Sequence, residues 1–123
     1  SHSKIETSFT KMFNLEHPIV AAPMFLVSDV KLTVAACKAG GMGAFPALNY
    51  RPVENFEKAV QEVKQKTDKA FAVNIIVQSK NNHQHKQLDI CLDKEVPLII
   101  TSLGGPRATI NKAKGTKTKF FVM

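Results

Sequence analysis

Residues that could contact a ligand follow an apolar run near the start of the sequence. Ala22, Pro23 and Met24 stand where the run "IVAA" should end as a strand. Pro23 has no backbone N–H, so it stops strand pairing and leaves the neighbouring backbone free to face a ligand. The alternative is structural: a proline that ends a strand next to a core methionine.

Two later apolar runs carry similar features. Asn74 stands inside "FAVNIIV", where a buried amide needs a hydrogen-bond partner from a ligand or a neighbouring strand. Ser102 and the pair Gly104–Gly105 follow "PLIIT" and open a helical stretch, where backbone N–H groups could hold an anion. A structural role is the alternative for each.

No catalytic residue and no metal site are predicted. His17, His83 and His85 have no carboxylate or nucleophile partner recognisable in the sequence. Cys37 and Cys91 occupy apolar positions of predicted helices without Cys-x-x-Cys spacing, so both are expected to be buried free thiols.

The charge and hydropathy patterns exclude several classes of protein. With 44% hydrophobic and 22% charged residues the chain reads as an ordinary globular domain. The formal charge is +7, but the lysines form no continuous stripe and no nucleic-acid motif accompanies them, so no nucleic-acid partner is expected. No run could span a membrane and no signal peptide is recognisable, so we expect a cytoplasmic protein.

The elements that must position these residues alternate along the chain. Five apolar runs predict strands buried on both faces, as in a parallel sheet, at 19–22, 42–45, 71–77, 97–101 and 119–123. Between them we expect a helix capped by Ser28, a helix starting at Pro52, a third carrying Leu88 and Cys91, and a short fourth near Pro106.

Strict alternation of this kind predicts an α/β fold with right-handed crossovers. Either an open doubly wound sheet or part of a (β/α) barrel satisfies it, and ligands bind at the carboxyl ends of the strands in both. A barrel requires neighbouring strands in sequence order, whereas an open sheet reverses its order at one point.

The segments "HPIVAAPMFLVSD", "AACKAGGMGAFPALNYRP", "FAVNIIVQS" and "VPLIITSLGGP", in this order, resemble the amino-terminal half of the nitronate monooxygenase (2-nitropropane dioxygenase-like) family. The resemblance implies a TIM-type (β/α)8 barrel, of which residues 1–123 would form about five βα units. It also implies an FMN-dependent oxidoreductase that oxidises alkyl nitronates with O2. Ala22, Pro23, Met24 and Asn74 would then contact the flavin ring, with Ser102 at the same rim.

Two features of that family have no counterpart in these residues. They are a catalytic histidine in a Gly-Gly-His stretch and the glycine-rich loops that bind the phosphate. We therefore expect residues 1–123 to be one partial barrel domain with half of the ring site, either as part of a longer enzyme or, as the alternative, as a truncated paralogue. Alone, we expect them to be inactive and to self-associate or aggregate through open strand edges. A homodimer is a further partner expected of the protein.

Two alternative functions stay open at this stage. One is an FMN-dependent enoyl-acyl-carrier-protein reductase of the same fold, and the other is a non-enzymatic α/β binding module. Nitronate and O2 are the partners expected under the leading interpretation.

Overall fold

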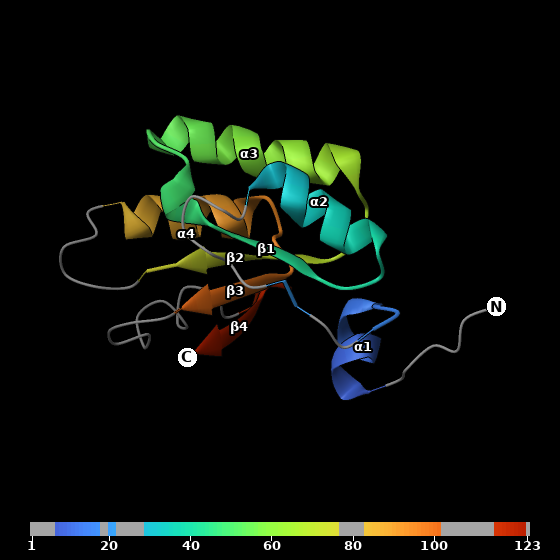
Figure 1. The fold of residues 1–123 in the computed structure, drawn as a ribbon. Helices are drawn as coiled ribbons and strands as arrows, with labels where there is room; N and C mark the ends of the chain where they lie inside the picture. Colours follow the sequence, from blue (N-terminus) through green and yellow to red (C-terminus); the bar gives the residue numbers. More distant parts are fainter. Residues whose placement is uncertain (1–6, 18–19, 22–28, 77–82, 102–114, 123) are drawn as a thin grey trace.

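The computed structural model describes residues 7–17, 20–21, 29–76, 83–101 and 115–122. These residues form a parallel sheet with helices packed mainly on one side (Figure 1). The elements, in chain order, are α1 Ser8–Phe13, α2 Val30–Lys38, β1 Gly43–Pro46, the 3-10 turn η1 Ala47–Asn49, α3 Val53–Lys66, β2 Phe71–Ile75, α4 Gln84–Asp93, β3 Leu98–Thr101 and β4 Lys119–Val122.

The sheet has the strand order that a barrel requires. Its four strands are adjacent in the order β1-β2-β3-β4, and all three pairs are parallel. Before them, Val20 forms a parallel bridge with Met42, and the Ala21 N–H donates to the Met42 carbonyl at 2.8 Å. The chain near Val20 therefore continues the same wall beside β1. No reversal of order occurs among these strands, which confirms the partial (β/α) barrel and excludes the open doubly wound sheet.

Helices α2, α3 and α4 cover one face of the sheet (Figure 1). In α3, the apolar side chains recur at helical spacing, and those of Phe56, Val60 and Val63 are fully buried. Pro52 occupies the N-cap position of α3, at the predicted start of this helix. Lysines lie in the last turn of α3, where their positive charge interacts favourably with the negative end of the helix dipole. The predicted face of α4 is confirmed by buried Leu88 and Cys91.

Helix α2 begins one residue later than the sequence suggested. Asp29, not Ser28, is its N-cap: the Asp29 carboxylate accepts the Leu32 backbone N–H at 2.8 Å. Adjacent Ser and Asp are both good caps, so the sequence alone does not choose between them. Ser28 itself lies outside the described residues, as does the short helix predicted near Pro106.

Helix α1 was not predicted. It is only six residues long, and Thr7 and Thr10 form a reciprocal capping box at its start. Asn14, in the left-handed conformation at φ 55°, ends it. The helix lies at the amino-terminal ends of the strands, apart from the other helices (Figure 1). There Phe13 and the following Leu15 join a small core on the sheet face that α2, α3 and α4 leave uncovered.

Candidate functional site

The two faces of the sheet have different side chains, and the difference locates the candidate site. Phe45, Phe71, Val73, Ile75 and Ile99 pack with the helices in the larger core. Alternate residues of the same strands form the smaller core with α1, and we call their side of the sheet the inner face, because it would face the axis of a barrel. Its members from the sheet are Met42, Ala44, Ala72, Leu98 and Ile100.

Asn74 lies on the inner face. It is two residues beyond Ala72 on β2, so strand alternation puts both side chains on one side of the sheet. Pro46 on β1 and Ile100 on β3 are its register partners. Asn74 is only half-buried, whereas the β2 residues before it are buried. It is therefore a polar group near the carboxyl end of the inner face, which is where barrels bind ligands.

The other predicted ligand contacts lie outside the described residues. These are Ala22, Pro23, Met24 and Ser102. The described residues next to them fix only where the chain enters each segment: Ala21 is hydrogen-bonded beside β1, and Thr101 ends β3 in register with Ile75. The expectation that Met24 and Asn74 contact one ring stays a prediction.

A pocket of about 290 Å³, which we call the rim pocket, follows the carboxyl end of β1 and was not predicted from the sequence. It is lined by Asn49, Tyr50, Arg51, Asn55, Lys58, Ala59 and Glu62. The Tyr50 hydroxyl accepts the Val30 backbone N–H at 3.0 Å, and its ring meets Phe45 edge-on with centroids 5.6 Å apart. These contacts fix Tyr50 between η1 and the start of α2. Burial raises the pKa of Tyr50; the Val30 hydrogen bond opposes this, and the charges of Asp29 and Glu62 add to it.

Four potentially reactive side chains, those of Cys37, Cys91, His83 and His85, do not form a reactive centre on the inner face. Both thiols are free and buried, as predicted. Burial raises the pKa of Cys37, whose S–H donates to the Ala70 carbonyl at 3.4 Å, and raises that of Cys91 far more. His83 and His85 are exposed at the start of α4, which packs on the opposite face from Asn74. A thiol kept protonated by burial is a poor nucleophile.

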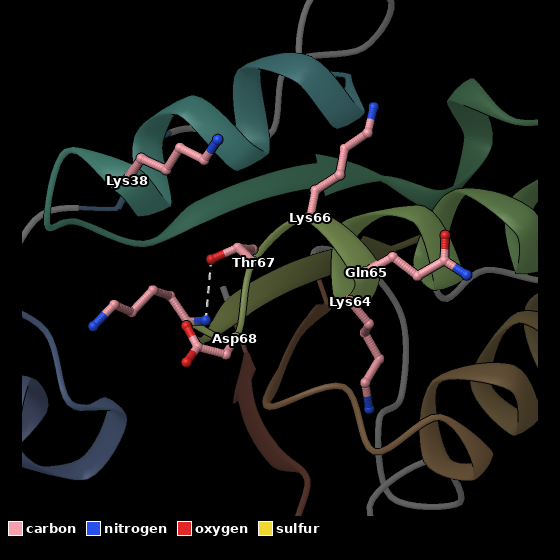
Figure 2. A pocket seen from close by; sticks show the side chains of 7 residues that line it. Lys38, Lys64, Gln65, Lys66, Thr67 and Asp68 are labelled. Atoms are coloured by element: carbon pink, nitrogen blue, oxygen red, sulfur yellow. Dashed lines mark hydrogen bonds between the residues drawn. The ribbon is translucent and has the colours of Figure 1, made fainter.

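A second depression, of about 460 Å³, is lined by Lys38, the end of α3 and the loop before β2. Figure 2 shows that its lysine side chains point away from one another rather than toward a common centre. Lys64 donates to the Lys94 carbonyl, and Lys66 pairs with Glu62 at 2.6 Å. This depression lies at the amino-terminal ends of the strands, opposite to Asn74, and we regard it as a solvated surface.

The described residues contain neither a metal-binding cluster nor a membrane-spanning helix. Within those ranges, no group of three or more His, Cys, Asp or Glu side chains could hold a metal ion. None of the helices described here has the length and apolar character needed to cross a membrane.

Comparison with known proteins agrees with this fold and defines the family. The family model for nitronate monooxygenase matches residues 6–106, so the chain belongs to the nitronate monooxygenase family. A nitronate monooxygenase from Pseudomonas aeruginosa is 37% identical over 67 residues, which are 54% of this chain and 19% of that protein. A probable nitronate monooxygenase from Staphylococcus aureus is 30% identical over 80 residues, which are 65% and 22% of the two chains.

Solved structures extend the likeness in shape to almost the whole chain. The structure of FabK from Thermotoga maritima matches with a TM-score of 0.86 and 29% identity, over 97% of this chain and 37% of that one. A nitroalkane oxidase from Streptomyces ansochromogenes matches with a TM-score of 0.78 at 24% identity, over 94% and 42%, and shows the fold alone. The chain thus spans about a fifth of the curated relatives and about two fifths of these structures.

Proposed function

We propose that the protein is an FMN-dependent oxidoreductase that oxidises alkyl nitronates with O2, and that Asn74 hydrogen-bonds the flavin ring. The family match and the relatives named nitronate monooxygenase support the reaction. The observation that carries the cofactor is the half-buried amide of Asn74 at the carboxyl end of the inner face.

The described residues fit a flat aromatic ring at this place. Ala44 and Ala72, buried on the inner face, are small and precede Pro46 and Asn74 along their strands. The Asn74 amide offers both a donor and an acceptor, which suits a ring whose edge carries carbonyl oxygens, bare nitrogens and one N–H. Under the proposal, the backbone of Ala22, Pro23 and Met24, together with Ser102, completes the contacts from neighbouring strands.

The chain's own residues bind and orient rather than react. Bound flavin would supply the redox chemistry by taking electrons from the nitronate carbon and passing them to O2. Asn74 would fix the position of the ring against the strands by a hydrogen bond. Ile100, its neighbour on β3, would help to keep water from the ring. No proton transfer is assigned to these residues, because among the described ones none on the inner face near Asn74 is a general base.

The cofactor assignment is tested by replacing Asn74 in the protein with Val. Loss of a ligand hydrogen bond should weaken FMN binding about tenfold and shift the flavin absorbance bands. Ile75→Val is the matched control: it alters the same strand on the helix-facing side and should leave FMN affinity unchanged while costing about 1 kcal/mol of stability. Unchanged FMN binding in Asn74→Val would contradict the assignment.

The reaction is tested on flavin-loaded protein with two substrates. Oxygen consumption with propionate 3-nitronate supports the proposal. NADH-dependent reduction of an enoyl thioester, without nitronate oxidation, would instead indicate the enoyl-acyl-carrier-protein reductase that was the alternative. A colourless protein that cannot be reconstituted with FMN would refute both enzymes and favour a binding module.

The same proposal predicts that residues 1–123 alone neither bind FMN tightly nor oxidise a nitronate. In barrels the phosphate is frequently bound after strands seven and eight, and a few ring hydrogen bonds of about 1 kcal/mol each do not replace that interaction. Titration calorimetry of FMN into this segment checks the point. A sub-micromolar Kd with measurable turnover would overturn it.

A further inference from the structure

The rim pocket has two cationic side chains, those of Arg51 and Lys58, that no ion pair among the described residues and no proposed flavin contact uses. It lies between η1 and α3, beyond the carboxyl end of β1. Its residues belong to the helix-facing side of the wall, because Tyr50 and Ala59 contact the larger core. It is therefore separate from the inner face that carries Asn74.

The charges of the rim pocket are unbalanced. Arg51 and Lys58 are exposed, and neither forms an ion pair with any carboxylate in the described part of the chain. Glu62, the acidic residue of the lining, is bound to Lys66 at 2.6 Å. The pocket thus presents two cations without ion-pair partners among the described residues, beside one acid that pairs with Lys66.

Neutral hydrogen-bond donors accompany these cations. The Tyr50 oxygen accepts the Val30 N–H, so its own proton is directed to another acceptor, and none of the described residues provides one. The Asn55 amide donates to the Arg51 carbonyl at 2.8 Å, which ties the backbone of Arg51 to α3. Tyr50 is held by backbone and ring contacts, so its hydroxyl is already oriented before a ligand binds.

We propose that the rim pocket binds a phosphate group, with Arg51 and Lys58 as its cationic contacts and the Tyr50 hydroxyl as a neutral donor. The guanidinium fork matches two phosphate oxygens, and Lys58 supplies a point charge. A volume of about 290 Å³ exceeds that of one phosphate, so the group can belong to a larger ligand. This proposal does not depend on the flavin chemistry proposed above.

The test uses the protein with any bound flavin retained. Inorganic pyrophosphate and, in a separate experiment, ADP are titrated into it, and NMR monitors binding. Saturable shifts are expected at Tyr50, Arg51 and Asn55. Arg51→Gln combined with Lys58→Gln should weaken binding at least about tenfold, because both charge-assisted hydrogen bonds to the phosphate are lost. Both positions are exposed, so the double variant should keep the fold. Equal affinity for both probes supports a site for the phosphate group alone, and tighter binding of ADP supports a nucleotide ligand.

The matched control removes two lysines from the depression of Figure 2 by the combination Lys38→Gln and Lys69→Gln. It lowers the net charge equally and should leave binding at the rim pocket unchanged. Tyr50→Phe, which keeps the ring against Phe45, should weaken binding about fivefold. Equal weakening by the two double variants would show general charge attraction and overturn the proposal, as would the absence of saturable binding.

Discussion

Replacing Gly43 with Ala tests how closely α2 packs on the sheet. A Cβ atom at Gly43 would lie 2.1 Å from the Thr33 carbonyl oxygen and 2.7 Å from its carbonyl carbon and Cα. All three are backbone atoms in the middle of α2, so no side-chain rotation relieves the clash. Overpacking of this kind costs about 3 kcal/mol, and the lower entropy of the unfolded chain offsets at most about 1 kcal/mol. We therefore expect a net loss of about 2 kcal/mol or more.

Gly115→Ala is the control for this substitution. Gly115 has φ +84°, but nothing lies within 4 Å of the added Cβ, so its cost comes from the dihedral angle alone, about 1 kcal/mol. Urea denaturation followed by far-UV circular dichroism measures both variants. The reasoning is refuted if Gly43→Ala costs less than Gly115→Ala, because α2 would then be able to move away from β1.

Three further substitutions probe other described contacts. Asp29→Ala should lower the free energy of unfolding by about 1 kcal/mol in the same assay, because the Leu32 N–H loses its cap; an unchanged midpoint would contradict the assignment of Asp29 as the cap. Cys91→Ala should remove a loss of stability that the parent protein shows at high pH. Burial raises the pKa of the Cys91 thiol in the folded state, so the free energy that this neutral thiol contributes to folding is complete below the unfolded pKa of about 8.5. It falls as the pH rises above that value. Comparing urea midpoints at pH 8 and pH 10 isolates this effect, and parallel pH dependence in variant and parent would refute it. Glu62→Gln should change stability by less than about 0.5 kcal/mol, since its ion pair with Lys66 is exposed, and a larger loss in urea would show an unexpected role for Glu62.

The strands and their order could be predicted because their signal is local and strong. Runs such as "FAVNI" and "LIIT" are apolar on both faces, which is typical of buried parallel strands, and alternation with helices limits the topology. The predicted strand ends differ from the observed ones: β2 stops at Ile75, two residues before the predicted end, and β1 extends to Pro46. The family resemblance then favoured the barrel, and the observed strand order confirms it.

Features that depend on tertiary contacts could not be predicted in this way. A six-residue helix such as α1 carries too few turns for a periodic pattern, and its Thr7–Thr10 box departs from the usual Glu or Gln at the second position. The rim pocket depends on Tyr50 reaching Val30, twenty residues earlier, and no spacing rule indicates that contact. Asn74 could be singled out because a polar residue within an apolar run is a local anomaly, and its contact with a ligand stays a prediction.

The alternation of β2 has a consequence for how this chain can change during evolution. Every second side chain of β2 packs in the helix-facing core, namely those of Phe71, Val73 and Ile75. The side chains of Ala72 and Asn74 point to the other face and contribute little to that core. A substitution at Asn74 therefore alters the inner surface without creating a cavity beneath the helices. Under the proposed flavin contact, ligand preference could therefore change at this position while the constraints on folding stay with its neighbours.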